Sequence, residues 1–559
     1  MTGENKLTYL PLGGAGEIGM NMYLYGYGPV GDQRFILVDC GVTFPEMEGT
    51  PGVDLIMADP AFIAERADRL EAIIITHAHE DHVGALGMLW PRLQAPVIAR
   101  PFTALIARNK LERAGLNPDI VREAPVWPKS VAVGPFTVGF VPVAHSIPEC
   151  SALVIDTPAG RIFHSADLKL DRTPLVGEPF DEEMFAEIGR QGVKALTCDS
   201  TNVFSLHPGR SEADIVPAIN ALMREAKGLV VATTFASNIA RLRTLAQAAH
   251  DNGRSVVVMG RAMNTMIQAG FAAKVLPGFP PITDPREAEN IPRDHLFILA
   301  TGSQGERRAA IAQLASQSYM GFRLKPGDTV LFSSKTIPGN EVSVGRILNQ
   351  LAEQDVTVIE ADDRYHVSGH ANRPDLERVH QLLKPQNLIP MHGEYRHLRA
   401  HAELGRAGGI PSVIASNGAV VDLTGAQAQV IDNVETGRVY LDGTQMIGAM
   451  DGIVRTRIHM ALRGHVVVSV MLEEDGTLSD SPWVEVAGLA DALPKGRGAS
   501  LTRSLEQEIE AALEKAGRGA LRNDETVEKL VEKTVRHVAN DLVGKKPVVT
   551  TLINRFEEG

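Results

Sequence analysis

The stretch IIITHAHEDHVGAL, residues 73–86, decides the fold. An apolar, β-branched run that is typical of a buried strand ends directly in three histidines, an aspartate and a glutamate. Buried titratable groups are stable only where something compensates them. Imidazole and carboxylate suit zinc, so the cluster favours a metal-binding loop over a solvated helix start that Asp81 caps. The candidate ligands are His77, His79, Asp81 and His82.

Other strands of the first 200 residues also end in ligand-type side chains. PVAHSIPE places His145 after one strand, and FHSADLKL places Asp167 after another. Asp39 follows a third strand, in VDCG. Strand ends that converge on one edge of a sheet would bring these side chains to the loop of histidines, so the pattern predicts one shared site.

Length, charge and cysteine usage limit the class of protein. A chain of 559 residues is too long for one ordinary core, so we expect about two to four domains. The net charge of -13 argues against a protein that coats nucleic acid through a bulk basic surface, although a local basic channel remains possible. Neither a membrane span nor a signal peptide is recognisable, so we expect no membrane partner. Three separated cysteines (Cys40, Cys150, Cys198) favour a cytoplasmic protein with reduced thiols.

The order of strands and helices predicts an α/β protein with several parts. The first 200 residues contain short strands and one longer helical pattern, around 102–114. From about residue 211, strands alternate with helices, which indicates βαβ units around a mostly parallel sheet. Past about residue 448 the sequence becomes charged and loop-like, as in a linker. The end is typical of a small α+β module, with a helix from about Glu525.

The glycine-rich stretch GGAGEIGMN has two interpretations. Gly14, Gly16 and Gly19 have the spacing of a dinucleotide-binding motif, and Asp39 follows about twenty residues later. That motif requires a helix to begin at the glycines. The following residues, MYLYGYGPV, alternate like a strand instead. We therefore expect a glycine-rich turn between two strands.

The histidine loop and the later strand ends resemble the metal motifs of the metallo-β-lactamase fold. The resemblance implies an αββα sandwich with two zinc ions per subunit. One zinc would be held by His77, His79 and His145, the other by Asp81 and His82, with Asp167 bridging the pair and Asp39 supporting the loop. Manganese or magnesium could participate as well. Two such metals activate a bridging hydroxide, so the reaction is hydrolysis, but the fold does not specify its substrate.

Three motifs of the second half resemble those of the β-CASP nucleases, a branch with an inserted domain that acts on nucleic acids. TCDST places Asp199 at a strand end, SGH contains His370, and HGE places His392 at another strand end. Asn372 and Pro374 follow as the expected cap and first turn of a helix. The structural alternative for Asp199 is a turn or helix cap.

Nine motifs between residues 13 and 397 resemble, in order, those of the ribonuclease J family. They are GGAGEIGMN, THAHEDHVGAL, AHSIPE, CDSTN, TFASNIAR, ATGSQGE, FSSKTIPGN, HVSGHA and MHGEYRH. The resemblance implies an α/β metallo-β-lactamase sandwich, an inserted β-CASP α/β domain and a small C-terminal α+β domain. The expected parts are 1–210 and 373–447 for the sandwich, 211–372 for the insertion, 448–464 for a linker and 465–559 for the C-terminal domain.

The same resemblance implies the roles of individual residues. His392 would complete the ligands of the second zinc, and the catalytic residues would be Asp81, His370 and Asp199. His370 would contact the scissile phosphate, while Asp199 would orient its neighbours. RNA phosphates, including a 5′-monophosphate, would be held by Ser237, Asn238, Ile239, His366, Val367, Ser368, Gly369 and His370. A helix start and a donor-rich loop both suit anions, although a capping role explains Ser237 equally well.

The implied activity is that of a zinc-dependent 5′-to-3′ exoribonuclease with endoribonuclease activity. Its partner would be single-stranded RNA, preferably 5′-monophosphorylated, in mRNA decay and rRNA maturation, and the enzyme would be a homodimer or homotetramer. Three alternatives remain. A DNA-repair β-CASP nuclease typically lacks a histidine at the position of His392. A small-molecule metallohydrolase leaves the second half of the chain unused, and a non-catalytic RNA-binding or scaffold subunit would be expected to lack ligands.

Overall fold

The computed structural model describes residues 4–316, 318–337, 339–493 and 500–556. Pro338, within the FSSKTIPGN motif, lies outside the described residues. Contacts divide the chain into two compact units, Met1–Thr43 with Met57–Arg438, and Phe44–Ile56 with Val439–Gly559. Among the described residues, no helix has the length and apolar character needed to cross a bilayer.

Two β-sheets pack face to face in the first unit. The eight-stranded sheet has the order β24-β23-β1-β3-β4-β7-β8-β9, and the six-stranded sheet has the order β10-β11-β12-β13-β14-β21. Apolar side chains from both sheets form one buried core between them, because each strand directs alternate residues inward. The strands of the first sheet are β24 (Gln429–Asn433), β23 (Ala419–Asp422), β1 (Asn5–Gly13), β3 (Met22–Pro29), β4 (Arg34–Val38), β7 (Leu70–Ile75), β8 (Val97–Ala99) and β9 (Val121–Glu123). Those of the second are β10 (Ser130–Val133), β11 (Phe136–Pro142), β12 (Ser151–Thr157), β13 (Gly160–His164), β14 (Ala195–Asp199) and β21 (Leu388–Met391).

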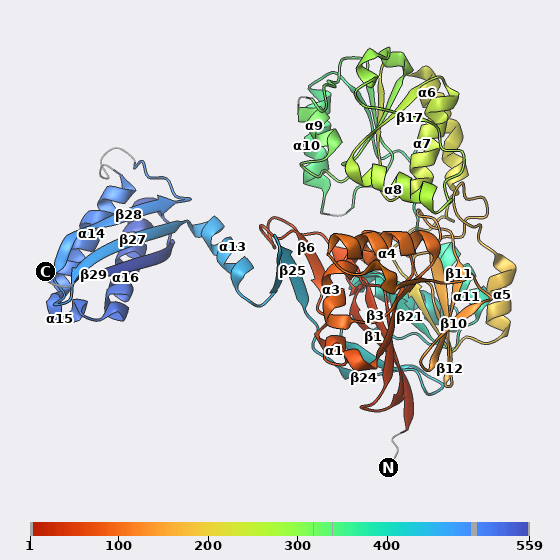
Figure 1. Cartoon of the computed structure of the whole chain (residues 1–559), viewed down its shortest axis with the longest axis horizontal. Coiled ribbons are helices and arrows are strands. Elements are labelled where there is room, and N and C mark those ends of the chain that lie inside the picture. Colours follow the sequence, from red (N-terminus) through yellow and green to blue (C-terminus); the bar gives the residue numbers. More distant parts are fainter. Residues whose placement is uncertain (1–3, 317, 338, 494–499, 557–559) are drawn as a thin grey trace. The chain divides into compact units, whose positions relative to one another are not determined.

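Helices form the outer layers of this sandwich (Figure 1). α4 (Pro101–Arg113) contacts β8 and β9 and confirms the helical pattern expected around 102–114. On the second sheet, a separate apolar cluster joins the strands to α5 (Glu182–Arg190), α11 (Arg373–Leu383) and α12 (Tyr395–Ala407). α11 begins as predicted, with Asn372 as its cap in a capping box with Asp375. The αββα arrangement is therefore confirmed.

The inserted domain lies between β14 and α11 in the sequence. Its six strands, in the order β17-β16-β18-β15-β19-β20, are all parallel, as the strand-helix alternation predicts. They are β17 (Ile282–Thr283), β16 (Ser255–Met259), β18 (Leu296–Ala300), β15 (Val230–Thr233), β19 (Thr329–Phe332) and β20 (Thr357–Ile359). The helices are α6 (Val216–Glu225), α7 (Ile239–Asp251), α8 (Arg261–Ala272), α9 (Ala310–Ser316) and α10 (Glu341–Ala352). α9 begins four residues after the ATGSQGE motif ends at Glu306.

The glycine-rich stretch is a turn between strands, as expected. β1 is followed by the short β2 (Ala15–Gly16) and then by β3, with no helix at the glycines. Gly14, Gly16 and Gly19 have φ values of 80°, 98° and 95°, a region that glycine occupies without strain. This conformation explains the glycines without a dinucleotide.

The second unit contains a three-stranded sheet backed by helices. β27 (His465–Glu473) lies between β28 (Leu478–Ala487) and β29 (Val548–Phe556). One face packs on α14 (Leu501–Ala516) and α16 (Asp524–Val543), which confirms the α+β module. The segment expected to be loop-like instead contains a helix, α13 (Ile453–Arg463), whose only buried side chain is Val454. Residues 439–447, which the sequence motifs assign to the sandwich, cluster with this unit, while the boundaries of the five parts stay predictions.

Candidate metal centre

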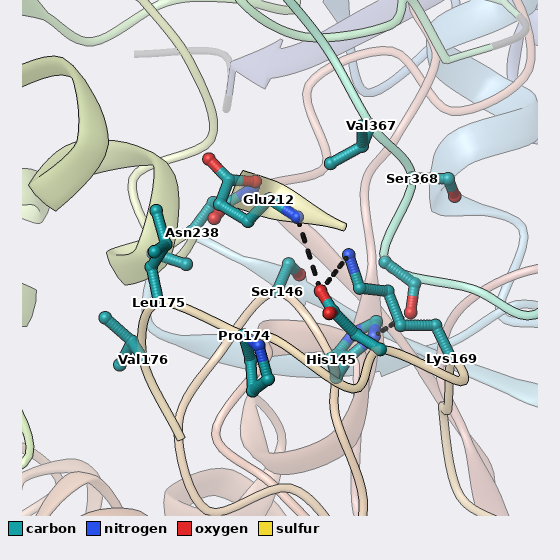
Figure 2. A pocket seen from close by; sticks show the side chains of 13 residues that line it. His145, Ser146, Lys169, Pro174, Leu175, Val176, Glu212, Asn238, Val367 and Ser368 are labelled. Carbon is teal, nitrogen blue, oxygen red and sulfur yellow. Dashed lines mark hydrogen bonds and ion pairs between the residues drawn. The ribbon is translucent and has the colours of Figure 1, made fainter. Parts of the chain in front are cut away.

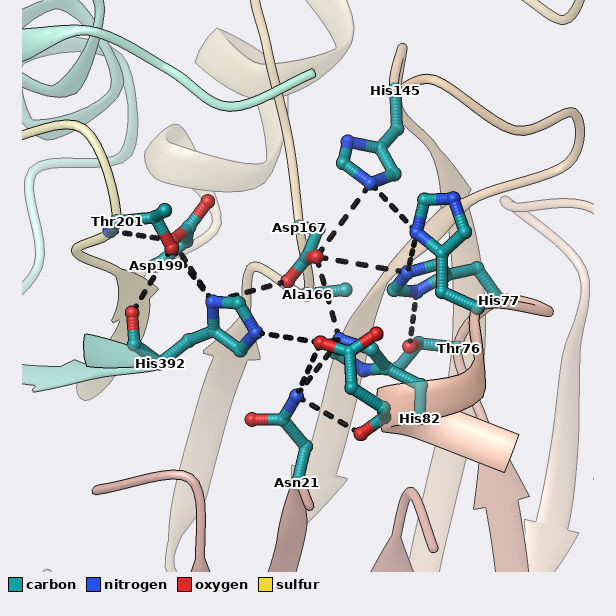
Figure 3. Close-up of polar contacts among 12 residues, drawn as sticks. Asn21, Thr76, His77, His82, His145, Ala166, Asp167, Asp199, Thr201 and His392 are labelled. Carbon is teal, nitrogen blue, oxygen red and sulfur yellow. Dashed lines mark hydrogen bonds and ion pairs between the residues drawn. The ribbon is translucent and has the colours of Figure 1, made fainter. Parts of the chain in front are cut away.

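The strand ends named above meet at one edge of the sandwich. His77 and His79 follow β7, His145 follows β11, Asp167 follows β13, and His392 follows β21. β13, β14 and β21 run parallel, so their carboxyl ends lie side by side. Figure 3 shows the side chains of His77, His145, Asp167 and His392 directed toward one another. The sandwich thus assembles the site from residues that lie more than 300 positions apart in the sequence.

Three histidines and one aspartate form the first cluster. His77 Nε2 and His145 Nε2 each lie 3.1 Å from His79 Nδ1. Asp167 Oδ2 lies 3.7 Å from His77 Nε2 and 3.6 Å from His145 Nε2. One ligand atom from each residue therefore faces a common point.

Two aspartates and two histidines form the second cluster. Asp81 Oδ2 lies 3.2 Å from His392 Nε2 and 3.5 Å from His82 Nε2. His82 Nε2 is also 3.4 Å from Asp167 Oδ2. Asp167 is therefore shared by both clusters, and its bridging of two metals stays a prediction.

Neighbouring groups fix the orientation of the histidine rings. His145 Nδ1 donates to the backbone oxygen of Gly369 at 2.6 Å, which leaves its Nε2 lone pair facing the cluster. His82 Nδ1 is 2.8 Å from Asp39 Oδ2, while Asp39 Oδ1 accepts from the backbone N–H of Thr76 at 2.8 Å. Asp39 therefore supports the loop in the way the sequence predicted, and its contacts set which ring nitrogen is available.

Chemistry and burial of the donors fit divalent cations. The clusters offer imidazole nitrogens and carboxylate oxygens, the ligands of zinc and similar metals. Asp167 Oδ1 is buried without a hydrogen-bond partner, as expected of a group whose partner is a cation. Burial lowers the pKa of His79 to about 4 and lowers those of His77 and His145 strongly. These histidines are therefore neutral near pH 7, which is the metal-binding form.

Carboxylates give the centre a strong attraction for positive charge. Burial lowers the pKa of His392, but Asp167 and Asp199 outweigh that effect and raise the pKa to about 10. The pKa of His82 is raised in the same way, because Asp167 and Asp81 outweigh its burial. The negative potential that keeps protons on the rings of His392 and His82 also attracts a divalent cation.

Three residues of the centre have left-handed backbones that side chains other than glycine rarely adopt. The φ values are 64° at Asp39, 50° at Ala166 and 50° at His392. Such residues cost about 1–3 kcal/mol each and persist where surrounding contacts enforce them. Each one lies immediately after a strand or beside Asp167, so the strained turns direct these side chains to the site.

His370 and Asp199 form a pair beside the clusters. His370 Nδ1 is 2.7 Å from Asp199 Oδ2, and its Nε2 is 4.0 Å from Asp167 Oδ2. Its side chain is 20% exposed, so one ring edge remains accessible to a substrate. Asp199 Oδ1 also accepts from the backbone N–H of Thr201 at 2.9 Å. The turn-capping and orienting interpretations of Asp199 therefore both hold geometrically.

A pocket adjoins His145 and contains half of the predicted RNA-binding residues (Figure 2). Its lining includes Asn238, Val367, Ser368 and Gly369, and also Lys169, which the sequence motifs did not indicate. Ser237, Ile239, His366 and His370 are not among the lining residues. The side chain of Ile239 is fully buried, so only its backbone is available for a contact with RNA. Asn238 caps α7 by accepting from the N–H of Arg241.

A glycine is required where this pocket meets the first cluster. A Cβ at Gly369 would lie 2.7 Å from His145 Cε1, closer than real contacts allow. Only glycine lets the loop approach closely enough for its backbone oxygen to hold the ring of His145. The pocket and the first cluster therefore share His145, and Gly369 links them a second time by holding that ring.

Two functional residues were missed by the sequence motifs. Asn21 donates to Asp81 Oδ2 at 3.3 Å and lies 3.0 Å from His82 Nε2. Thr201 Oγ1 lies 2.7 Å from His392 Nδ1. The available signal was a polar residue next to a strand end, at the ends of GGAGEIGMN and TCDST.

Four family models match the chain, and together they cover most of it. Residues 16–231 match the metallo-beta-lactamase superfamily, and residues 227–351 match the ribonuclease J beta-CASP domain. Residues 359–415 match the Zn-dependent metallo-hydrolase RNA specificity domain, and residues 452–556 match the ribonuclease J C-terminal domain. The matched domains follow the order of the sandwich, the insertion and the C-terminal module.

Several curated proteins are similar over nearly the whole length. A ribonuclease J from Sinorhizobium meliloti is 42% identical, over 99% of this chain and 98% of that protein. Ribonucleases J from Mycolicibacterium smegmatis and Thermus thermophilus are 34% and 35% identical, over 97% and 86% of this chain and 96% and 84% of those proteins. A crystal structure of a protein of unknown function from Enterococcus faecalis V583 matches with a TM-score of 0.52 at 18% identity, covering 75% of this chain and all of that one. That structure supports the fold alone.

Proposed function

The chain belongs to the ribonuclease J family and is a metal-dependent ribonuclease, and from this premise we propose which metals, residues and RNA ends its reaction uses. The observation that carries the proposal is the pair of clusters joined by Asp167, with a pocket directly beside them. Two cations held by these adjoining clusters would suit the hydrolysis of a phosphodiester. Family membership disfavours the small-molecule hydrolase and the DNA-repair nuclease considered above.

We propose two zinc ions per subunit. His77, His79 and His145 would hold one ion, and Asp81, His82 and His392 the other, with Asp167 contacting both. When bound, such a pair lowers the pKa of a water molecule and stabilises the charge that develops on the attacked phosphate. Mixed nitrogen and oxygen ligands favour zinc, although the carboxylates also suit manganese or magnesium.

Residues of the chain would carry out the remaining steps. His370 lies with its Nε2 edge toward the clusters and Nδ1 on Asp199, so it is placed to bind the scissile phosphate and protonate the leaving oxygen. Asp199 would hold that ring in one orientation, and the burial of Asp199 raises the cost of leaving its carboxylate without this partner. Asn21 and Thr201 would keep Asp81 and His392 in place.

The pocket beside His145 would bind the 5′ end of single-stranded RNA. Ser368, Gly369 and Asn238 provide polar groups there, and the Lys169 ammonium lies among them, paired with the Asp171 carboxylate at 3.2 Å. The short distance from pocket to metal clusters favours removal of nucleotides one at a time from a 5′-monophosphate end, while internal cleavage needs the clusters alone. Roles in mRNA decay and rRNA maturation, a homodimeric or homotetrameric state and a cytoplasmic location are further proposals that follow from the family.

The test is a time course on RNA with three different 5′ ends. A 5′-monophosphate RNA should be degraded at least about tenfold faster than the same RNA with a 5′-triphosphate or a 5′-hydroxyl, because only the monophosphate fits the pocket. Mononucleotides should appear from the first time point, whereas internal cleavage produces longer fragments. Equal rates on all three ends would remove the 5′-end pocket from the proposal, and a lack of RNA hydrolysis with zinc and with manganese would remove the two-metal reaction.

A further inference from the structure

Arg241 on α7 is the largest fully buried side chain of the described residues, and its surroundings are unusual. A buried guanidinium is costly unless its charge is paired and its N–H groups are satisfied. Glu212 supplies the charge, with its Oε1 2.6 Å from Nε and its Oε2 2.9 Å from Nη2. This two-point pair neutralises the cation and fixes its plane.

The remaining donors of Arg241 hold two segments of the inserted domain. Nη1 donates to the backbone oxygen of Ser333 at 2.7 Å and to that of Tyr365 at 3.3 Å. Nη2 donates to the backbone oxygen of Val367 at 3.4 Å, and Nη1 lies 3.3 Å from His366 Nδ1. One planar group therefore fixes the end of β19 and the loop that contains His366 and Val367.

The same residue also fixes the other side of the pocket. The backbone N–H of Arg241 donates to Asn238 Oδ1 at 2.9 Å, which is the cap of α7. Asn238 lines the pocket from one side, and Val367, Ser368 and Gly369 line it from the other, as Figure 2 shows for the labelled side chains. Arg241 itself does not line the pocket, so it acts on the substrate only through these neighbours.

We propose that Arg241 is a positioning residue that sets the spacing between the start of α7 and the 366–369 loop, and thereby the selection of the 5′ end. The inference rests on the proposed 5′-end pocket. Two sides of a pocket select a phosphate only when their donors are held at a fixed separation. The metal clusters contact this part of the chain through Gly369 O and through His370, whose Nε2 lies 4.0 Å from Asp167 Oδ2. His370 has anchors of its own in the sandwich, because its Nδ1 lies 2.7 Å from Asp199 Oδ2 and its backbone oxygen accepts from Asn202. Loss of the Arg241 contacts therefore affects 5′-end selection more than cleavage itself.

Arg241→Lys is the informative variant, because lysine keeps the charge for Glu212 but lacks the planar fork that reaches three carbonyls. The measured quantity is kcat/KM on 5′-monophosphate RNA divided by kcat/KM on the same RNA with a 5′-hydroxyl. This ratio should fall by about tenfold or more, mainly through KM on the monophosphate RNA. Internal cleavage of a circular RNA, which has no 5′ end, should change by less than about twofold.

Arg254→Lys is the matched control. Arg254 is another buried arginine of the inserted domain, and its guanidinium also donates to backbone oxygens, those of Met223, Ala226, Gly228 and Leu296. None of these residues lines the pocket, so its replacement should leave the 5′-end ratio unchanged even where it lowers thermal stability. Far-UV circular dichroism and Tm establish that both variants are folded at the assay temperature.

The possible results separate the inference from the function on which it rests. A wild-type enzyme that discriminates 5′ ends and an Arg241→Lys variant with the same ratio would overturn the inference alone. An equal fall in 5′-end selection and circular-RNA cleavage would also overturn it, because a general structural role predicts that result. Absence of discrimination in the wild-type enzyme would overturn the 5′-end pocket and the inference together.

Discussion

At the scale of single residues, Asp167 links the two clusters into one centre. Its two oxygens face histidines of both clusters, and Oδ1 has no hydrogen-bond partner. Burial raises the pKa of this carboxyl, but His392 and His82 outweigh that effect and hold the pKa well below its usual range. The carboxylate is therefore ionised near neutral pH, the form that binds cations.

Two single variants should distinguish a loss of bound metal from a loss of activity alone. His82→Ala removes a ligand nitrogen from the second cluster, so bound zinc should fall from two to about one per chain and RNA hydrolysis by at least about 100-fold. Asp199→Asn keeps the shape of the side chain and lies outside the ligand sets proposed above, so zinc content should be unchanged while hydrolysis falls by a similar factor. Elemental analysis of the purified protein measures the zinc content. His250→Ala is the surface control.

Either of two results would contradict this assignment. Full hydrolysis by His82→Ala with the second zinc absent would show that one metal suffices. Loss of both zinc ions from Asp199→Asn would show that this carboxylate is a ligand rather than an orienting group. Circular dichroism of each variant establishes that the fold is intact.

The ligands could be predicted from the sequence because titratable residues at the end of an apolar strand are conspicuous. Asn21 and Thr201 could not, because their contacts with Asp81 and His392 depend on turns that bring distant residues together. The contacts of Arg241 could not be predicted either, because the partners of its guanidinium lie 29 to 126 positions away in the sequence. A lone arginine in an amphipathic helix predicts an exposed side chain, whereas this one is buried.

At the scale of elements, a chain of hydrogen bonds links two outer helices to the strand that carries Asp199. His380 on α11 and His401 on α12 have their Nε2 atoms 3.1 Å apart, and His401 Nδ1 lies 3.0 Å from Ser200 Oγ. Burial lowers the pKa of His380 to about 4 and that of His401 strongly. Both rings are therefore neutral in the folded protein near neutral pH.

This chain of hydrogen bonds should make the fold sensitive to acid. An unfolded histidine binds a proton below about pH 6.5, whereas folded His380 does so only near its pKa of about 4. The contribution of His380 to the free energy of unfolding is therefore fully present above about pH 6.5. It decreases as the pH falls, by about 2 kcal/mol between pH 7 and 5. His380→Gln can still hydrogen-bond His401 but does not titrate, so its free energy of unfolding should decrease less over that range.

Urea unfolding at pH 7 and pH 5 measures the difference between wild type and variant. His250→Gln changes an exposed histidine and should retain the wild-type acid dependence. An acid dependence of His380→Gln equal to that of the wild type would exclude the buried pair as its source.

The elements themselves were predictable where their period was regular. The parallel strands and helices of the inserted domain and the capped start of α11 follow from local patterns. α13 was missed because the stretch DGIVRTRI is rich in charged residues and shows no clear apolar face. The structure leaves nearly all of α13 unburied. Its glycines at both ends, Gly452 and Gly464, were the available boundary signals.

At the scale of the whole molecule, the two compact units have separate cores. The C-terminal sheet and its helices bury their own apolar cluster, and β29 pairs with β27 along nine residues. Sequence composition predicted more than one domain, but the membership of residues 44–56 in the second unit depends on contacts that no local pattern reveals. Arg457, for example, reaches Pro51 and Asp442.

A fragment of residues 464–559 should fold by itself. It contains every residue of the C-terminal apolar cluster. It should therefore unfold cooperatively and give dispersed NMR spectra. Residues 464–547 lack β29 and should not fold, because β27 would lose its parallel partner and the core one of its edges. A disordered longer fragment, or an equally folded shorter one, would contradict the independence of this unit.

The bridging of distant segments at the metal centre has a consequence for biosynthesis. The first ligands, at residues 77–82, are made early, but His392 is made only after the entire inserted domain. A nascent chain therefore has no complete second cluster until residue 392 has left the ribosome. The order of the segments therefore delays assembly of the second cluster until most of the chain has been made.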